Sequence, residues 1–154
     1  MQRLDPTPSA KSEAHYDVDF FAWTRRTAAL LRSGRFDELD VEHLAEEVED
    51  MGRRERRELA SRLVVLVAHL LKWSQQPAGR SPSWEATIAS QRAEIGDLLD
   101  DNPSLRAEVA SQVTRRWTVA IKHAAAETRL PADSFPPDCP WSAEQILDGT
   151  FYPS

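Results

Sequence analysis

The sequence predicts an all-α protein, an up-and-down bundle of four main helices, and three observations support this class. Apolar residues recur at steps of three and four over long segments, the spacing that keeps one face of a helix against a core. Glycine, proline, serine and asparagine separate these segments, as they do at helix ends. We find no segment with the period of a strand and no internal repeat.

The N-terminal part of the chain is expected to contain an arm and a first helix. Residues 1–15 mix proline, serine and charged residues without periodicity, which predicts a flexible arm. Residues 16–154 have the size of a single helical-bundle domain. Its first helix is predicted from about Val18 to Arg32, with Asp17 as N-cap and Gly34 just beyond its end.

A long second helix is predicted over about residues 41–75. Asp40 is placed to cap it, and Pro77 ends it because proline moves the preceding residue out of the helical region. At about 1.5 Å per residue the helix would span roughly 50 Å, more than a compact domain of this size needs. We therefore expect it to project or to meet a partner, with a homodimer through this helix as one arrangement. Its predicted buried stripe consists of Leu44, Val48, Met51, Leu59, Leu63, Leu66, Leu70 and Trp73.

Two further helices are predicted after it. Ser81 and Pro82 are typical of the N-cap and first residue of a helix that ends near Asp101. Asn102 and Pro103 repeat this signal for a fourth helix, which ends near residue 128.

The C-terminal part is expected to lie over the bundle. The segment LPADSFPPDCPW is rich in proline and predicts an extended chain. Ser142 and Gln145 fit a capping box for a last short helix, Ala143 to Asp148.

Composition limits the partners. The net charge of −6 gives no general case for binding nucleic acid or an anionic membrane, and we predict neither partner. Cys139 is the only cysteine, so an internal disulfide is excluded and a reducing cytoplasm is expected. The longest apolar run is too short to cross a bilayer.

Several segments together resemble a known family. These segments are YDVDFFAW, LLRSGRFDELDVEHLAEEVEDMG, HLLKW, RSPSW, QR at 91–92, and FPPDCPWSAEQILD. In their order and spacing, the chain from about Tyr16 to Pro153 is similar to the mainly cyanobacterial and proteobacterial family catalogued as domain of unknown function 29. This resemblance implies an all-helical bundle in a bacterial cytoplasm and brings no established activity, substrate or catalytic residue. Arg129 stands where the family pattern has glycine, which argues against a left-handed helix cap there.

A cationic and aromatic cluster near the turn between the second and third helices is the first candidate site. Arginine and lysine gathered around tryptophan can bind a carboxylate or phosphate through hydrogen bonds and stacking. The alternative is that the tryptophans end the core and the cationic stems cover them. The residues are Lys72, Trp73, Arg80, Trp84, Gln91 and Arg92.

A metal or acid/base site is the second candidate. His43 and Glu47 lie four residues apart and so share a helical face, and Glu46 lies beside them. His69 interrupts an apolar run and needs a hydrogen-bond partner, whether in a core or at a site. A solvated acidic face and a satisfied core histidine are the alternatives.

Function is predicted only by class. The common nucleotide, zinc and acyl-transfer motifs have no counterpart in the sequence. We therefore expect an interaction or ligand-binding module that binds a protein partner or a small anion and needs no cofactor. The alternative is a metal-dependent or acid/base enzyme that uses His43, Glu46, Glu47 and His69 with a divalent metal.

Overall fold

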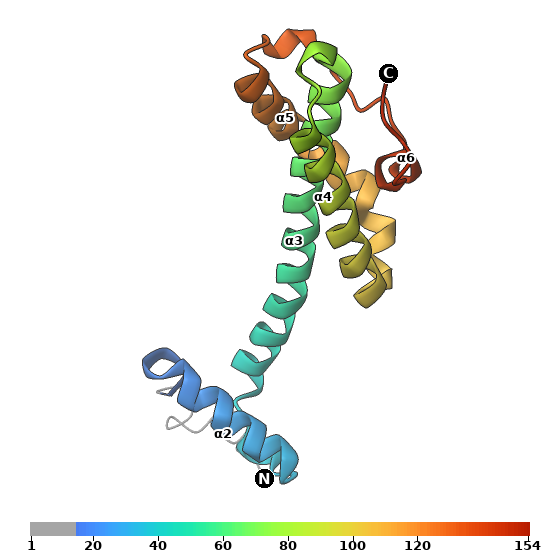
Figure 1. The fold of residues 1–154 in the computed structure, drawn as a ribbon. Helices are drawn as coiled ribbons and strands as arrows, with labels where there is room; N and C mark the ends of the chain where they lie inside the picture. The colour runs from blue at the N-terminus through green and yellow to red at the C-terminus, as the bar shows by residue number, and fades with distance from the viewer. Residues whose placement is uncertain (1–14) are drawn as a thin grey trace, which may run out of the picture. The chain divides into compact units, whose positions relative to one another are not determined.

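Every regular element in residues 15–154, the part that the computed structural model describes, is an α-helix or a 3-10 helix (Figure 1). This confirms the all-α class. The chain divides into two compact units, Met1–Arg53 and Arg54–Ser154, which we call the N-terminal and C-terminal units. The prediction of one domain over residues 16–154 stays a prediction, and most of the expected N-terminal arm lies outside the described residues.

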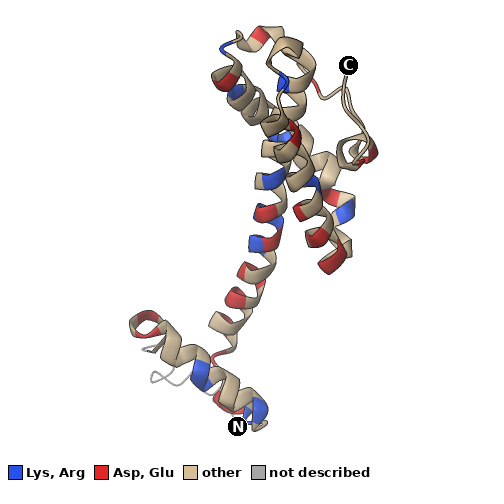
Figure 2. Cartoon of the chain, in the orientation of Figure 1, with Lys and Arg blue, Asp and Glu red and all other residues tan. Residues whose placement is uncertain are grey.

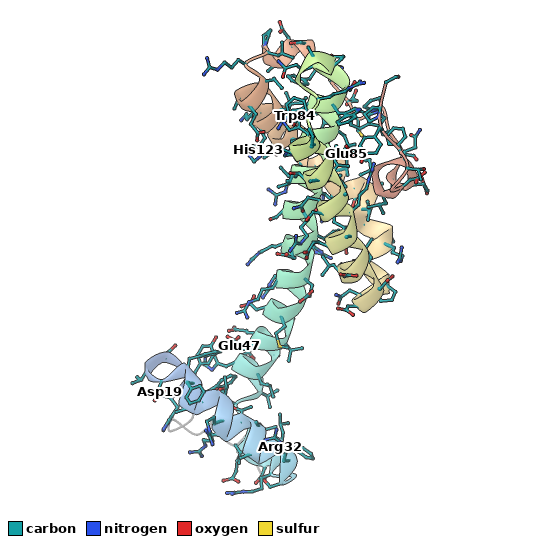
Figure 3. The ribbon with its side chains drawn as sticks, in the orientation of Figure 1. Asp19, Arg32, Glu47, Trp84, Glu85 and His123 are labelled. Carbon is teal, nitrogen blue, oxygen red and sulfur yellow. The ribbon has the colours of Figure 1, made fainter. Side chains whose placement is uncertain are left out.

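The N-terminal unit contains α2 (Phe20–Arg32), the 3-10 helix η1 (Phe36–Glu38) and the beginning of α3. The prediction of Asp17 as the cap of the first helix was wrong. Residues 15–18 form a helical turn of their own, and Asp19 leaves the helical region at φ −145° to accept from the amide of Ala22 at 2.9 Å (Figure 3). Gly34 has φ 71°, which confirms its place beyond the helix.

The long helix α3 (Val41–Gln75) has the predicted bounds. Asp40 caps it by accepting from the amide of His43 at 3.3 Å. The prediction of one buried stripe along its whole length was wrong at the N-terminal end, where Val48 and Met51 are 60 and 61% exposed. The stripe is buried only from Leu59 to Leu70, and Trp73 is partly buried. Periodicity shows that a face is apolar and not that the chain covers it.

A tight connection joins α3 to α4 (Pro82–Asp101) through the 3-10 helix η2 (Pro77–Gly79). Ser81 caps α4 by accepting from the amide of Trp84, as predicted. A Cβ atom at Gly79 would lie 2.8 Å from the Trp84 ring. The close passage of the chain beside this indole therefore requires glycine.

The fourth predicted helix begins later than its sequence signal. Pro103–Glu108 form the 3-10 helix η3, and α5 runs over Val109–Thr128. The side chain of Asn102 makes no capping hydrogen bond to η3. Its amide NH2 group donates to the carbonyl of Leu98 at 3.1 Å and so closes the end of α4. The argument that Arg129 disfavours a left-handed cap was also wrong, since Arg129 adopts φ 60° and ψ 16° at the end of α5.

The last elements are η4 (Ala132–Ser134) and α6 (Ala143–Leu147). The capping box of Ser142 and Gln145 is confirmed. Between them the chain is pinned by the Trp117 indole, which donates to the carbonyl of Pro136 at 2.9 Å.

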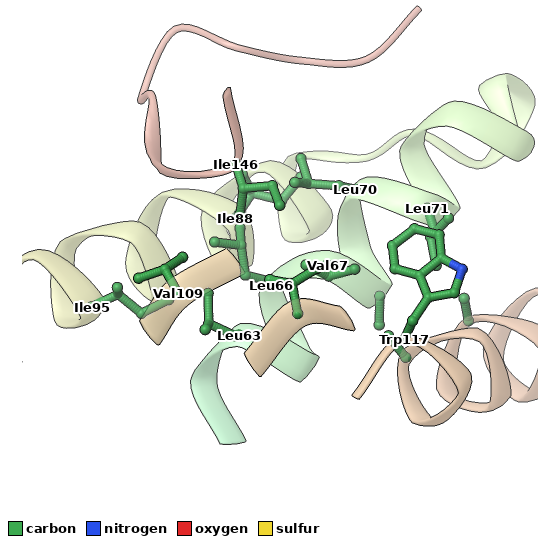
Figure 4. Packing of buried hydrophobic residues seen from close by; sticks show 14 of the residues in the cluster. Leu63, Leu66, Val67, Leu70, Leu71, Ile88, Ile95, Val109, Trp117 and Ile146 are labelled. Atoms are coloured by element: carbon green, nitrogen blue, oxygen red, sulfur yellow. The ribbon is translucent and has the colours of Figure 1, made fainter. Parts of the chain in front are cut away.

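The core of the C-terminal unit is a single hydrophobic cluster drawn from α3, α4, α5 and α6 (Figure 4). Leu63, Leu66 and Leu70 of α3 are at most 1% exposed. They pack in one cluster with residues of the other helices, among them Ile88, Ile95, Val109, Trp117 and Ile146. No helix in residues 15–154 is long and apolar enough to span a membrane.

Candidate functional sites

The buried Lys72 links three helices. It is 2% exposed, and its Nζ pairs with the carboxylate of Glu127 on α5. The same Nζ lies 4.4 Å from the centroid of the Trp84 ring on α4 (Figure 3), within the range of a cation–π interaction. The hydrogen bond from Lys72 Nζ to the carboxylate lowers the pKa of Glu127. The network satisfies a buried ammonium with groups of the chain itself.

His69 belongs to the same network. Its Nδ1 lies 2.9 Å from the carbonyl oxygen of Val65 and donates to it, so Nε2 carries the lone pair and faces Lys72 Nζ at 3.4 Å. Burial lowers the pKa of His69, and the ammonium of Lys72 lowers it further. His69 is therefore a neutral histidine with both ring nitrogens engaged, one of the alternatives that the sequence left open.

Arg92, another residue of the predicted cationic and aromatic cluster, binds the C-terminal segment of the chain. Arg92, 7% exposed, donates from Nε to the carbonyl of Ile146 at 2.9 Å and from Nη2 to that of Phe151 at 2.8 Å. Its guanidinium lies 5.5 Å from the centroid of Tyr152, which in turn packs against Trp73 at 4.9 Å. The fork of Arg92 thus fastens α6 and the residues that follow it to α4.

Arg80 covers the outer side of Trp73. Its Nε donates to the carbonyl of Trp73 at 2.9 Å, and its guanidinium lies 5.1 Å from a ring centroid of the same residue. Lys72 therefore has internal partners that account for its burial, and the exposed Arg80 is held by Trp73. Arg92 donates to two carbonyls, but its buried Nη1 has no hydrogen-bond partner among the described residues. Gln91 has a buried Oε1 with no partner among the described residues. The anion site at this hairpin stays a prediction.

The residues of the metal alternative lie apart. His43 belongs to the N-terminal unit and His69 to the C-terminal unit. His43 Nδ1 lies 2.6 Å from Asp40 Oδ2, and this hydrogen bond raises the pKa of His43. Within residues 15–154 no three histidine, cysteine, aspartate or glutamate side chains gather as metal ligands would. The structure gives the metal-enzyme alternative no support.

Tyr16 is a residue that the sequence analysis did not single out. Its ring stacks on His43 with centroids 3.9 Å apart, and its hydroxyl donates to Glu47 Oε1 at 2.7 Å (Figure 3). This hydrogen bond raises the pKa of Tyr16 to about 12. Glu47 thus has a structural partner, while Glu46 is exposed. The aromatic run at residues 16–23 was the available signal for this contact.

The exposed apolar side chains are concentrated in one unit. Within the described part of the chain, large apolar residues that are 42–84% exposed occur only in the N-terminal unit. The C-terminal unit buries its large apolar residues more completely. The exposed set is Val18, Phe20, Phe21, Leu31, Phe36, Val41, Val48 and Met51.

The sequence did not predict a groove that lies between α3 and α5. Its basic part has a volume of about 300 Å³ and is lined by Arg56, Arg57, Ala60, Gln112, Arg115, Arg116 and Val119. An adjoining part of about 310 Å³ is lined by Ala60, Ser61, Val64, Val65, Arg116, Val119 and His123. Paired arginines at 56–57 and 115–116 were the sequence signal, but nothing in the sequence showed that they face one groove.

Comparisons with known proteins identify one family and name no activity. Neither the curated proteins nor the solved structures contain a match. The model of one family, described as domain of unknown function DUF29, matches residues 15–152, which is most of the chain. The chain therefore belongs to the DUF29 family.

Proposed function

We propose that this chain is a helical interaction module that pairs with a second copy through the exposed face of α3. The observation that carries the proposal is the concentration of exposed large apolar side chains in residues 18–51. Such surfaces on folded proteins commonly mark interfaces. Three of these side chains, Val41, Val48 and Met51, lie on α3, and the other five belong to residues 18–36.

The α3 part of this surface is one helical face. Val41, Val48 and Met51 follow each other at steps of seven and three, and they are 60–65% exposed. By the 3.6-residue repeat, Leu59 and Leu66 continue the same face and are completely buried. A face of this kind is suited to packing against another apolar helix.

The charges of α3 favour an antiparallel second copy. The charged residues that precede Met51 in α3 are acidic, whereas the arginines that follow it alternate with Glu55 and Glu58, as Figure 2 shows along the helix. When two such helices pair in opposite directions about Met51, the acidic part of each lies beside the basic part of the other. The acidic residues are Glu42, Glu46, Glu47, Glu49 and Asp50, and the basic residues are Arg53, Arg54, Arg56 and Arg57.

A specific register satisfies both the apolar and the charged positions. If Val48 of each copy packs against Met51 of the other, heptad geometry places Glu47 beside Arg54 of the second copy on one flank. On the other flank it places Ala45 beside Gly52 of the second copy. Two small residues there allow the helix backbones to approach closely.

Gly52 supports this arrangement independently. A glycine inside an exposed helix costs about 1 kcal/mol relative to alanine. A Cβ atom at Gly52 would meet no atom within 4 Å, so packing within the described chain gives no reason for glycine. Close approach of a second helix supplies one.

The N-terminal segment is a poor competitor for this surface. Residues 1–14 contain only two large apolar residues, Met1 and Leu4. Eight exposed apolar side chains need a larger apolar partner.

We place the assembly in the cytoplasm, because the chain has a single, free cysteine and so contains no stabilising internal disulfide.

Disulfide trapping tests the proposed register. In a Cys139→Ser background, Ala45→Cys with Gly52→Cys should form a covalent dimer under mild oxidation. These positions are about 10 Å apart within one helix, too far for an internal bridge. Both are exposed, so the substitutions should not disturb the core.

The matched control is Ala45→Cys with Arg53→Cys, which moves one thiol to the side of the helix away from the partner. We expect the first pair to cross-link rapidly and the control slowly, on a non-reducing gel. Equal cross-linking of both pairs, or none in either, would contradict the proposal.

A further inference from the structure

The groove between α3 and α5 combines a basic part with an apolar part. The two parts adjoin, because Ala60, Arg116 and Val119 line both. All the lining residues belong to the C-terminal unit, so the groove is separate from the apolar face of α3 described above. A ligand that fills both parts needs a charged end and an apolar body.

The basic part holds four exposed arginines on a chain whose net charge is −6. Arg56 donates to Glu108 at 2.8 Å. The other three, Arg57, Arg115 and Arg116, have no ion-pair partner among residues 15–154. Their guanidinium groups are therefore available to a ligand.

The apolar part continues along the same two helices. Val64, Val65 and Val119 give it an aliphatic lining, and Ser61 and His123 add hydroxyl and imidazole groups to that lining. Arg116 lines this part as well as the basic part. It is thus placed at the junction between a charged head and an apolar body.

We propose that this groove binds a phosphate monoester with a small apolar body. Several arginine forks suit the three terminal oxygens of a phosphate better than the two of a carboxylate. The negative net charge disfavours a long polyanion, whose outer phosphates would meet a repelling surface. A volume of about 300 Å³ for each part fits a small ligand.

Calorimetric titration with three probes tests the two-part site. Hexyl phosphate carries both the head and the body, inorganic phosphate carries only the head, and hexanol carries only the body. We expect hexyl phosphate to bind at least tenfold more tightly than either of the others. Equal binding of inorganic phosphate would remove the role of the apolar part and overturn the proposal.

Arginine variants locate the site. Arg116→Gln should weaken hexyl phosphate at least tenfold, and Arg116→Lys should weaken it less because the charge is kept while the fork is lost. The control is Arg106→Gln, an exposed arginine of the same unit that pairs with Asp100 and does not line the groove. It should change the affinity less than twofold.

Three results would contradict the assignment. Equal weakening by the Arg106 and Arg116 variants would show only a general effect of charge. Tighter binding of a single-stranded oligonucleotide than of hexyl phosphate would assign the arginines to nucleic acid instead. An unchanged affinity of Arg116→Gln for hexyl phosphate, with an unchanged melting temperature, would show that the ligand binds outside this groove.

Discussion

The Nε2 of His69 faces the Nζ of Lys72 at 3.4 Å, one helical turn along α3. The imidazole accepts here, because its Nδ1 already donates to the carbonyl of Val65. Lys72 in turn pairs with Glu127 and lies over Trp84. The polar residues that looked most like a site in the sequence therefore connect three helices of the C-terminal unit.

Stability should fall on mild acidification because of His69. Burial and Lys72 lower its folded pKa below the ordinary value, so the unfolded state takes up a proton first. The contribution of His69 to the free energy of unfolding is complete above about pH 6.5 and is lost progressively as the pH falls below that value. Glu127, whose lowered pKa acts in the same direction, loses its contribution only in a more acidic range.

Urea unfolding at pH 7.5 and pH 5.5 measures this effect. His69→Gln should reduce the loss of unfolding free energy between the two values. The raised pKa of His43 acts in the opposite direction, but it is common to both proteins. The same pH dependence in wild type and variant would show that His69 is not the responsible group.

Arg92→Lys should loosen the C-terminal segment although the charge is kept. Lysine cannot reproduce a fork that binds the carbonyls of both Ile146 and Phe151, and the lost hydrogen bond should cost about 1–3 kcal/mol. Hydrogen exchange of residues 146–152 is the measurement. Arg80→Lys is the control, since exposed Arg80 binds one carbonyl. Unchanged protection in the Arg92 variant would argue against this anchoring role.

Leu66→Ala should destabilise the protein by about 2–5 kcal/mol by leaving a cavity in the core. Leu66 is 0% exposed and packs in the central cluster (Figure 4). Thr118→Ala, at an exposed position of α5, should change the free energy by less than about 0.5 kcal/mol. A melting temperature of Leu66→Ala within a degree of wild type would be incompatible with this core.

Arg129→Gly should stabilise the protein by about 1 kcal/mol. Arg129 has φ 60°, where a Cβ atom is strained and glycine is not. Arg129→Ala removes the same charge but keeps the Cβ atom, so it should have little effect. Chemical denaturation of both variants separates the backbone effect from the charge. Equal stability of the two variants would argue against strain at this position.

Local signals in the sequence predicted the elements well. The bounds of α3 followed from Asp40 and Pro77, and those of α6 from its capping box, because caps and proline act through neighbouring residues. Asp17 and Asp19 were harder to distinguish, since both precede the apolar pattern. The choice between them depended on a separate turn at residues 15–18.

Contacts between distant segments could not be predicted in the same way. The sequence placed Lys72 close to Trp84, but not Glu127, which approaches from α5. It likewise gave no means to bring Arg57 and Arg116 to one groove. Both depend on which faces of α3 and α5 meet, and one-dimensional periodicity does not fix that choice.

Sedimentation equilibrium of the wild-type protein at micromolar concentration tests the central claim most directly. The exposed face of α3 and its self-complementary charges predict a dimer of twice the 17.4 kDa chain mass. The dimer should weaken as the salt concentration rises, because the flanking ion pairs are screened. A mass of 17.4 kDa across the concentration range would contradict pairing through α3.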